Sequence, residues 1–141
     1  MEILIIALPL LASIISGGFG KLIGDRNSEI ITSFLVTISA ILSCLVLYDV
    51  IFNEYQDNIL IAKWISSGSL DVNWSMKIDP LSAVMLVVVT SVSSLVHIYS
   101  IGYMSHDPHK PRFMAYLSLF TFAMLTLVSS DNFLQLFFGW E

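Results

Sequence analysis

The chain has 141 residues, of which 56% are hydrophobic and 12% charged, and its mean hydropathy is +0.82. Its net charge of -5 arises from scattered acidic residues, without the basic cluster that a nucleic-acid-binding surface requires. The composition therefore excludes a soluble domain and disfavours a nucleic-acid-binding module. It predicts an integral membrane protein.

Four apolar stretches, each of a length to cross a bilayer as a helix, are predicted at residues 3–23, 30–52, 81–103 and 113–129. A fifth apolar stretch begins at residue 133 and is cut at residue 141. Only a short polar turn separates the first two helices, which makes them antiparallel neighbours, and Ser28 in this turn is the expected N-cap of the second helix. The sequence thus predicts an all-α polytopic membrane protein.

Small residues within the predicted helices indicate close helix packing. Glycines cluster in the first helix at Gly17, Gly18 and Gly20. The second and third helices carry hydroxyl side chains that are suited to hydrogen bonds between helices. These are Ser33, Thr37, Ser39, Ser43, Thr90, Ser91, Ser93 and Ser94. The single cysteine, Cys44, excludes an internal disulfide and is interpreted as a small core residue.

The segment between the second and third helices has a different pattern. Apolar and polar residues alternate from Leu70 to Ile78, which is typical of a strand, and residues 59–65 offer a partner strand. Because Ser66 to Ser69 supply a turn, we expect a β-hairpin over about residues 58–78, outside the membrane. Asp79 followed by Pro80 is the pattern of an N-cap and a first helical residue.

The distribution of basic residues predicts the orientation in the membrane. Four of them flank the turn after the first helix and the loop after the third helix, whereas the opposite side carries two. The four are Lys21, Arg26, Lys110 and Arg112, and the two are Lys63 and Lys77. The positive-inside rule then places the N-terminus on the extracytoplasmic side.

Glu141 is the main candidate for a functional residue. A helix that begins at Asn132 and rises about 1.5 Å per residue would carry Glu141 about 14 Å into a hydrocarbon core about 30 Å thick. An ionisable residue at that depth is by default a proposed proton or ion site, although a buried carboxylic acid hydrogen-bonded to other helices is the alternative. A free chain end at that depth is implausible, so we interpret the sequence as a part of a longer protein.

Histidines provide weaker candidates. His97 lies about two turns before the end of the third helix, where it is either a hydrogen-bonded structural residue or a proton relay that acts through its two ring nitrogens. His106, Asp107 and His109 are close in sequence, but Pro108 and the loop setting favour a solvated turn. No metal site is predicted.

An ordered set of residues resembles a known family. The set comprises Asp79, Pro80, Leu81 and Ser82, the run from Leu95 to Met104, the run from Arg112 to Tyr116, Asp131 with Asn132, and Gly139, Trp140 and Glu141. It resembles the antiporter-like large membrane subunit, of the subunit L type, of proton-translocating NADH:quinone oxidoreductase, respiratory complex I. The resemblance implies that residues 1–141 form the N-terminal part of one antiporter-like transmembrane domain.

The resemblance also implies a function and its site. In the family, the glutamate at the position of Glu141 pairs with a lysine on a later, broken helix, which this chain does not include. The complete subunit would couple quinone reduction elsewhere in the complex to proton transfer across the membrane, and this chain alone would not pump protons. It implies that the chain binds no cofactor, because the NADH, flavin, iron–sulfur and quinone sites belong to other subunits.

Partners and location follow from the same resemblance. The expected partners are the other membrane subunits of complex I, the lipid bilayer and the missing C-terminal part of the subunit, with no nucleic acid. The expected location is a bacterial inner membrane or an equivalent energy-coupling membrane. Two alternatives remain open: the large subunit of a Mrp-type cation/proton antiporter, which shares this core, and a split-gene or non-functional membrane fragment.

Overall fold

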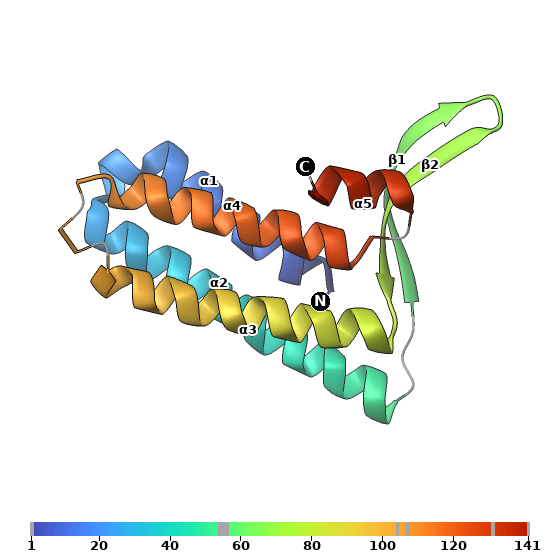
Figure 1. Ribbon diagram of the computed structural model, residues 1–141, viewed down its shortest axis with the longest axis horizontal. Coiled ribbons are helices and arrows are strands. Elements are labelled where there is room, and N and C mark those ends of the chain that lie inside the picture. Colours follow the sequence, from blue (N-terminus) through green and yellow to red (C-terminus); the bar gives the residue numbers. More distant parts are fainter. Residues whose placement is uncertain (1, 54–56, 104, 107, 131, 141) are drawn as a thin grey trace.

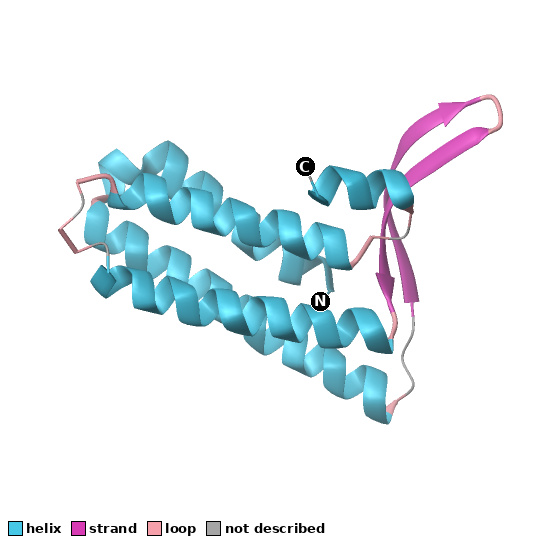
Figure 2. Ribbon diagram, in the orientation of Figure 1, coloured by secondary structure: helices cyan, strands magenta, loops and turns pink. Residues whose placement is uncertain are grey.

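The computed structural model of the protein describes residues 2–53, 57–103, 105–106, 108–130 and 132–140. The elements, in order, are α1 (Glu2–Ile23), α2 (Asp25–Phe52), β1 (Asp57–Ser67), β2 (Leu70–Ile78), α3 (Pro80–Tyr103), α4 (Lys110–Val128) and α5 (Phe133–Trp140). The predicted fold class is confirmed: the described chain is mostly helical, with a two-stranded antiparallel hairpin between the second and third helices (Figure 2).

The four long helices lie side by side as a bundle (Figure 1). The α1–α2 turn and the α3–α4 loop lie at one end of the bundle, and the hairpin lies at the other end, near the N-terminus. Each of α1, α2, α3 and α4 is long and apolar enough to cross a membrane. Large apolar side chains on their outer faces, such as Leu22 and Leu81, are exposed, as the lipid-facing surface of an integral membrane protein requires.

Small and hydroxyl residues make the contacts between the helices. A Cβ added to Gly20 of α1 would lie 2.6 Å from the Cβ of Pro111 in α4, so the Pro111 ring packs directly on the backbone of Gly20. Between α2 and α3, the Ser43 and Thr90 hydroxyls are 2.7 Å apart. Gly20, Ser43 and Thr90, which are among the small residues singled out in the sequence, therefore act as packing residues.

The start of α2 differs from the prediction. The helix begins at Asp25 instead of residue 30, directly after Gly24, whose φ of 94° is a conformation that glycine adopts readily. Ser28 is therefore inside the helix and not its N-cap. Its hydroxyl is 2.9 Å from the hydroxyl of Ser16, which links α2 to α1. A positive φ at Gly24 ends one helix and starts the next, so a longer polar turn is unnecessary.

The interpretation of Cys44 as a core residue is wrong, because its side chain is exposed. The buried face of α2 in this region contains Ser39, Ser43, Val46 and Val50, and Cys44 falls beside this face. Its position in an apolar segment could not decide the matter, since the surface of a membrane helix is as apolar as its core.

The β-hairpin closes one end of the bundle. Ser67 pairs with Leu70, and Gly68 in the turn has a φ of 61°, which favours glycine. Met76 and Ile78 of β2 are buried in the same cluster as helix residues. The cluster comprises Ile5, Val46, Val50, Met76, Ile78, Ala83, Leu86 and Leu125. The bundle thus covers the end of β2 at Met76 and Ile78, whereas Leu60, Trp64 and Leu70 of the hairpin are exposed.

A corner made of β2 and the α4–α5 connection sets the direction of α5. The Lys77 amide donates to the Ser129 carbonyl over 2.9 Å, and the Ser75 amide donates to Oε1 of Gln135 over 3.1 Å. The ring of Phe138 in α5 meets the ring of Trp74, with centroids 4.7 Å apart. These contacts turn the chain back so that α5 runs beside α4 (Figure 1).

Candidate functional site

His97 lies at the centre of a polar cluster between α3 and α4. Its side chain is fully buried, and it lies on the buried face of α3 with Thr90, Ser94 and Ser100. Nδ1 is 2.7 Å from the backbone oxygen of Ser93, and Nε2 is 3.1 Å from the hydroxyl of Ser118 on α4. Both ring nitrogens therefore have a protein partner.

These partners assign the tautomer of His97. A carbonyl oxygen only accepts, so Nδ1 carries the proton and donates to Ser93, while Nε2 accepts from the Ser118 hydroxyl. The Ser93 hydroxyl lies 3.3 Å from Nδ1 and also hydrogen-bonds the Thr121 hydroxyl of α4. The imidazole thus has a hydroxyl group beside each of its ring nitrogens, and the Ser118 hydroxyl links His97 of α3 to α4.

Glu141, the main candidate, lies outside the described residues. The described chain that leads to it is α5, an eight-residue helix with Gln135 and Gly139 buried. A Cβ on Gly139 would lie 2.7 Å from the backbone nitrogen of Leu127, so α5 packs directly on α4. The residues that precede Glu141 are accordingly held by α4 on one side and by the hairpin corner on the other.

Sequence reasoning missed Glu29. It belongs to α2, only 3% of it is exposed, and its Oε1 has no hydrogen-bond partner within the described part of the chain. A signal was present, because Glu29 begins a stripe of buried residues spaced alternately by three and four positions. The stripe continues through Thr32, Val36, Ser39, Ser43, Val46 and Val50. The late predicted start of the helix left Glu29 outside this pattern.

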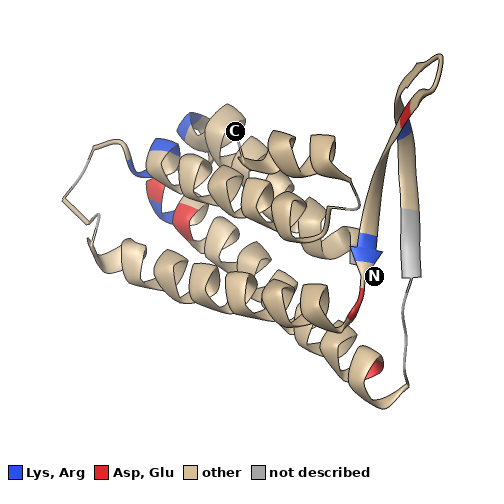
Figure 3. Ribbon diagram, turned by 45° about the vertical axis from the view of Figure 1, so that its right-hand side comes forward, with Lys and Arg blue, Asp and Glu red and all other residues tan. Residues whose placement is uncertain are grey.

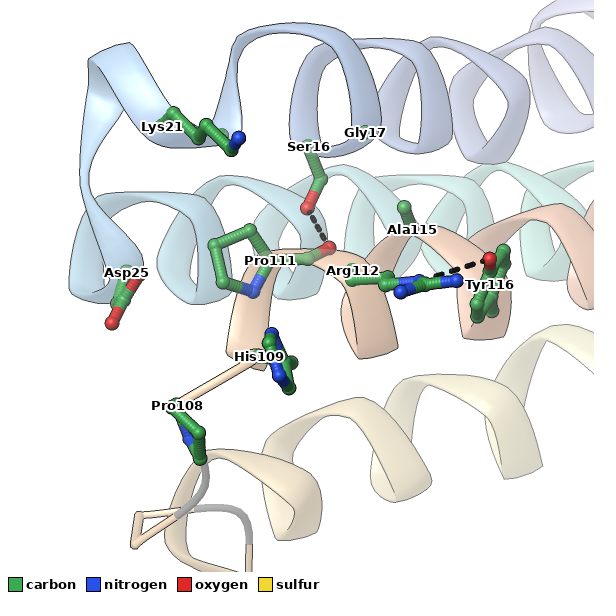
Figure 4. Close-up of a pocket in the computed structure, with 11 residues that line it drawn as sticks. Ser16, Gly17, Lys21, Asp25, Pro108, His109, Pro111, Arg112, Ala115 and Tyr116 are labelled. Carbon is green, nitrogen blue, oxygen red and sulfur yellow. Dashed lines mark hydrogen bonds between the residues drawn. The ribbon is translucent and has the colours of Figure 1, made fainter.

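A cavity of about 520 Å³ lies between the end of α1 and the start of α4 (Figure 4). Lys21, Asp25 and Arg112 are among its lining residues. Nε of Arg112 donates to the Tyr116 hydroxyl over 3.1 Å, and the guanidinium carbon lies 5.6 Å from the centroid of that ring. Acidic and basic residues gather at this end of the bundle (Figure 3).

The histidine-containing loop offers no metal site in the described residues, among which no group of three His, Cys, Asp or Glu side chains comes together. Asp107, which the sequence places between His106 and His109, lies outside those residues. The residues that the structure does bring together are the hydroxyl groups and His97 at the α3–α4 contact.

Comparisons with known proteins find relatives of this chain by sequence. Residues 64–114 match the family described as NADH-ubiquinone oxidoreductase (complex I), chain 5 N-terminus. The whole chain is 54% identical to NADH-ubiquinone oxidoreductase chain 5 of Arabidopsis thaliana, covering 21% of that protein. It is 52% identical over 137 residues (97% of the chain, 21% of the relative) to chain 5 of Phytophthora infestans, and 48% identical over its whole length, 24% of the relative, to chain 5 of Metridium senile.

The bundle of apolar helices and the buried polar seams define a polytopic integral membrane protein. Its homologues are chain 5 subunits of complex I, so the resemblance drawn from the sequence is confirmed. The chain spans about a fifth of the length of the curated relatives that it matches.

Proposed function

We propose that this chain forms part of a proton-translocating membrane subunit of complex I, in which quinone reduction elsewhere in the complex drives proton transfer across the membrane. One observation carries the proposal: the 54% identity to a chain 5 protein extends over all 141 residues, including the hairpin and the start of α5. Matches to chain 5 favour this function over that of a Mrp-type antiporter.

Two residues are proposed for the proton path. Glu141 is the proton-transfer residue, because it follows an apolar helix start and matches the family's glutamate after Gly139 and Trp140. His97 is the proposed relay, supported by the hydroxyl groups that meet both of its ring nitrogens. The structural role of His97 is compatible with this, since neutral imidazole can both donate and accept.

The remaining assignments follow from the proposed family function. The chain would hold no redox centre, and NADH, flavin, iron–sulfur and quinone would bind to other subunits. Its partners would be neighbouring membrane subunits of complex I and the remainder of its own subunit. We place it in a bacterial inner membrane or an equivalent energy-coupling membrane, with the N-terminus extracytoplasmic, which the basic residues gathered at the opposite end of the bundle support (Figure 3).

The test is the replacement Glu141→Gln in the full-length subunit, assembled in complex I and reconstituted in sealed vesicles. We expect fewer protons translocated per NADH oxidised, because Gln cannot take up a proton at neutral pH. Asp71→Asn, an exposed acid on the hairpin, is the control and should pump normally. Normal pumping by the Glu141 variant would overturn the role of Glu141, and the absence of the subunit from purified complex I would overturn the proposed function.

A further inference from the structure

Two buried polar atoms of α2 lack hydrogen-bond partners within the described part of the chain, and they lie one helical turn apart. They are Oε1 of Glu29 and the hydroxyl oxygen of Ser33. The two residues are 3% and 6% exposed, respectively. Because residues i and i+4 share one face of a helix, with Cβ atoms about 5–6 Å apart, these atoms belong to one site.

An acid with a purely structural role would satisfy its oxygens with protein donors, since a buried oxygen without a partner destabilises the fold. Here the acceptor Oε1 and a hydroxyl group that can donate occur together instead. A water molecule that bridges two buried polar groups is the usual solution to such a pair. The site thus has the chemistry of a hydrated acid inside a membrane bundle.

The surroundings of Glu29 connect this site to the polar end of the bundle. The charged residues whose fields act on Glu29 are Lys110 at the start of α4, together with Asp25 and Arg26 on its own helix. Glu29 is the fifth residue of α2, about 6 Å along the helix from Asp25. An acid at this position is close enough to the aqueous boundary to exchange a proton with it.

On its other side, Ser33 leads into the hydroxyl seam between α2 and α3. Thr37, the next residue on this face, donates to the Ser33 carbonyl over 2.7 Å. The Thr37 hydroxyl also lies 3.2 Å from the hydroxyl of Ser94 on α3. Ser94 stands one turn before His97 on the buried face of α3. Polar groups therefore extend from Glu29 toward the His97 cluster.

We propose that Glu29 is a second protonatable site of this subunit, which takes up a proton at the Lys110 end of the bundle through a water molecule held between Oε1 and the Ser33 hydroxyl. In the uptake step, a hydronium ion gives its proton to the carboxylate and leaves as water. In the release step, the O–H bond of the acid breaks and a water molecule takes the proton. The direction of net transfer rests on the proposed function, whereas the exchange itself does not.

The test is infrared difference spectroscopy on intact complex I in membranes, titrated from roughly pH 5 to pH 9. A protonated carboxylic acid has a carbonyl stretch that a carboxylate lacks. We expect a carbonyl band that changes with pH, shifts in D2O, disappears in Glu29→Gln and persists in the control Asp25→Asn, an exposed acid at the same end of α2. A pH-dependent spectrum that is identical in wild type and Glu29→Gln would overturn the proposal.

Ser33→Ala provides a second, milder variant if the glutamine variant does not assemble. Removing the hydroxyl should shift the frequency or the midpoint pH of the carbonyl band, because the bridging water loses a partner. An unchanged band would contradict the bridge. Since the band reports protonation and not pumping, it separates this proposal from the proposed function. Loss of pumping in Glu141→Gln with no Glu29 band would refute Glu29 alone, and a Glu29 band with normal pumping in Glu141→Gln would refute the role of Glu141 alone.

Discussion

Gly139 of α5 touches the backbone of Leu127 in α4, since a Cβ placed on Gly139 would lie 2.7 Å from the Leu127 nitrogen and 3.0 Å from the Ala123 carbonyl oxygen. Backbone atoms cannot move aside as a flexible side chain can. Gly139 stands two residues before Glu141 in the sequence, so this contact fixes the part of α5 that leads to the main candidate residue. The glycine thus has a packing reason that is independent of any family pattern.

Replacing Gly139 with Ala should push α5 away from α4. Overpacking a close contact costs about 1–3 kcal/mol, and here the obstacle is backbone. We expect a lower midpoint of thermal unfolding for the full-length subunit in detergent, and a loss of proton pumping if α5 positions Glu141.

The matched control is Gly18→Ala, because a Cβ at Gly18 of α1 meets nothing within 4 Å. Alanine is favoured over glycine in a helix by about 1 kcal/mol, so this variant should be as stable as the wild type or more stable. Equal stability of the Gly139 and Gly18 variants would contradict the close α4–α5 packing.

Gln135 anchors the hairpin to α5. Its Oε1 accepts from the buried Ser75 amide over 3.1 Å, and the side chain is 1% exposed. Gln135→Met keeps the approximate volume but leaves this amide without its acceptor, at a cost of about 1–3 kcal/mol. Hydrogen exchange at the Ser75 amide should become faster. Leu136→Met, at an exposed position of the same helix, is the control and should leave that exchange unchanged.

Asp79 gives the start of α3 a dependence on pH. Its Oδ1 accepts from the Ser82 amide over 2.7 Å, and Nζ of Lys77 lies 3.9 Å from Oδ2. The Ser82 amide, followed by the weaker effect of Lys77, lowers the pKa of Asp79 below its ordinary value. This stabilisation is therefore present above the unfolded-state pKa of about 3.9 and is lost as the pH falls through the lower pKa of the folded state.

We expect the first turn of α3 to exchange hydrogen faster at acidic pH, after correction for the intrinsic pH dependence of exchange. Asp79→Asn keeps an oxygen that can cap the helix but removes the titration. The wild type should show the acid-induced change and the variant should not. An identical pH dependence in both would contradict the assignment to Asp79.

The sequence predicted the elements well where one strong local signal determined each of them. Asp79 and Pro80 marked the start of α3, and the hydroxyl residues of α2 and α3 marked a helix contact. Cys44 was misplaced because apolar character does not separate the lipid face of a membrane helix from its core. Glu29 was missed because the predicted second helix began after it. For Glu29 the buried face was readable only from the three–four spacing of the stripe that begins with it.

The hairpin shows a second limit of prediction from the sequence, because contacts between distant residues decide which of its side chains are buried. The alternation predicted strand β2, in which Val72, Met76 and Ile78 are buried, yet Leu70 is exposed and the polar Ser75 is buried. Ser75 is buried because Gln135 of α5 lies on its backbone amide, a contact between residues 60 positions apart that no local pattern contains. Register irregularities between Leu60 and Ala62 and between Lys63 and Ile65 also interrupt the regular pairing with β1.

Variants at the contact between His97 and Ser118 test whether His97 has only a structural role or also relays protons. Ser118→Ala removes the hydroxyl that donates to Nε2 of His97. His97→Gln replaces the imidazole with an amide, which cannot take up a proton at neutral pH. Hydrogen bonds between membrane helices average about 0.6 kcal/mol in double-mutant cycles. We therefore expect a coupling energy of that size between the two substitutions in the free energy of unfolding of the full-length subunit, which would measure the α3–α4 hydrogen bond. If His97 also relays protons, His97→Gln should reduce proton pumping in assembled complex I even where its stability matches that of Ser118→Ala. Pumping that follows stability alone in both variants would leave His97 with the structural role.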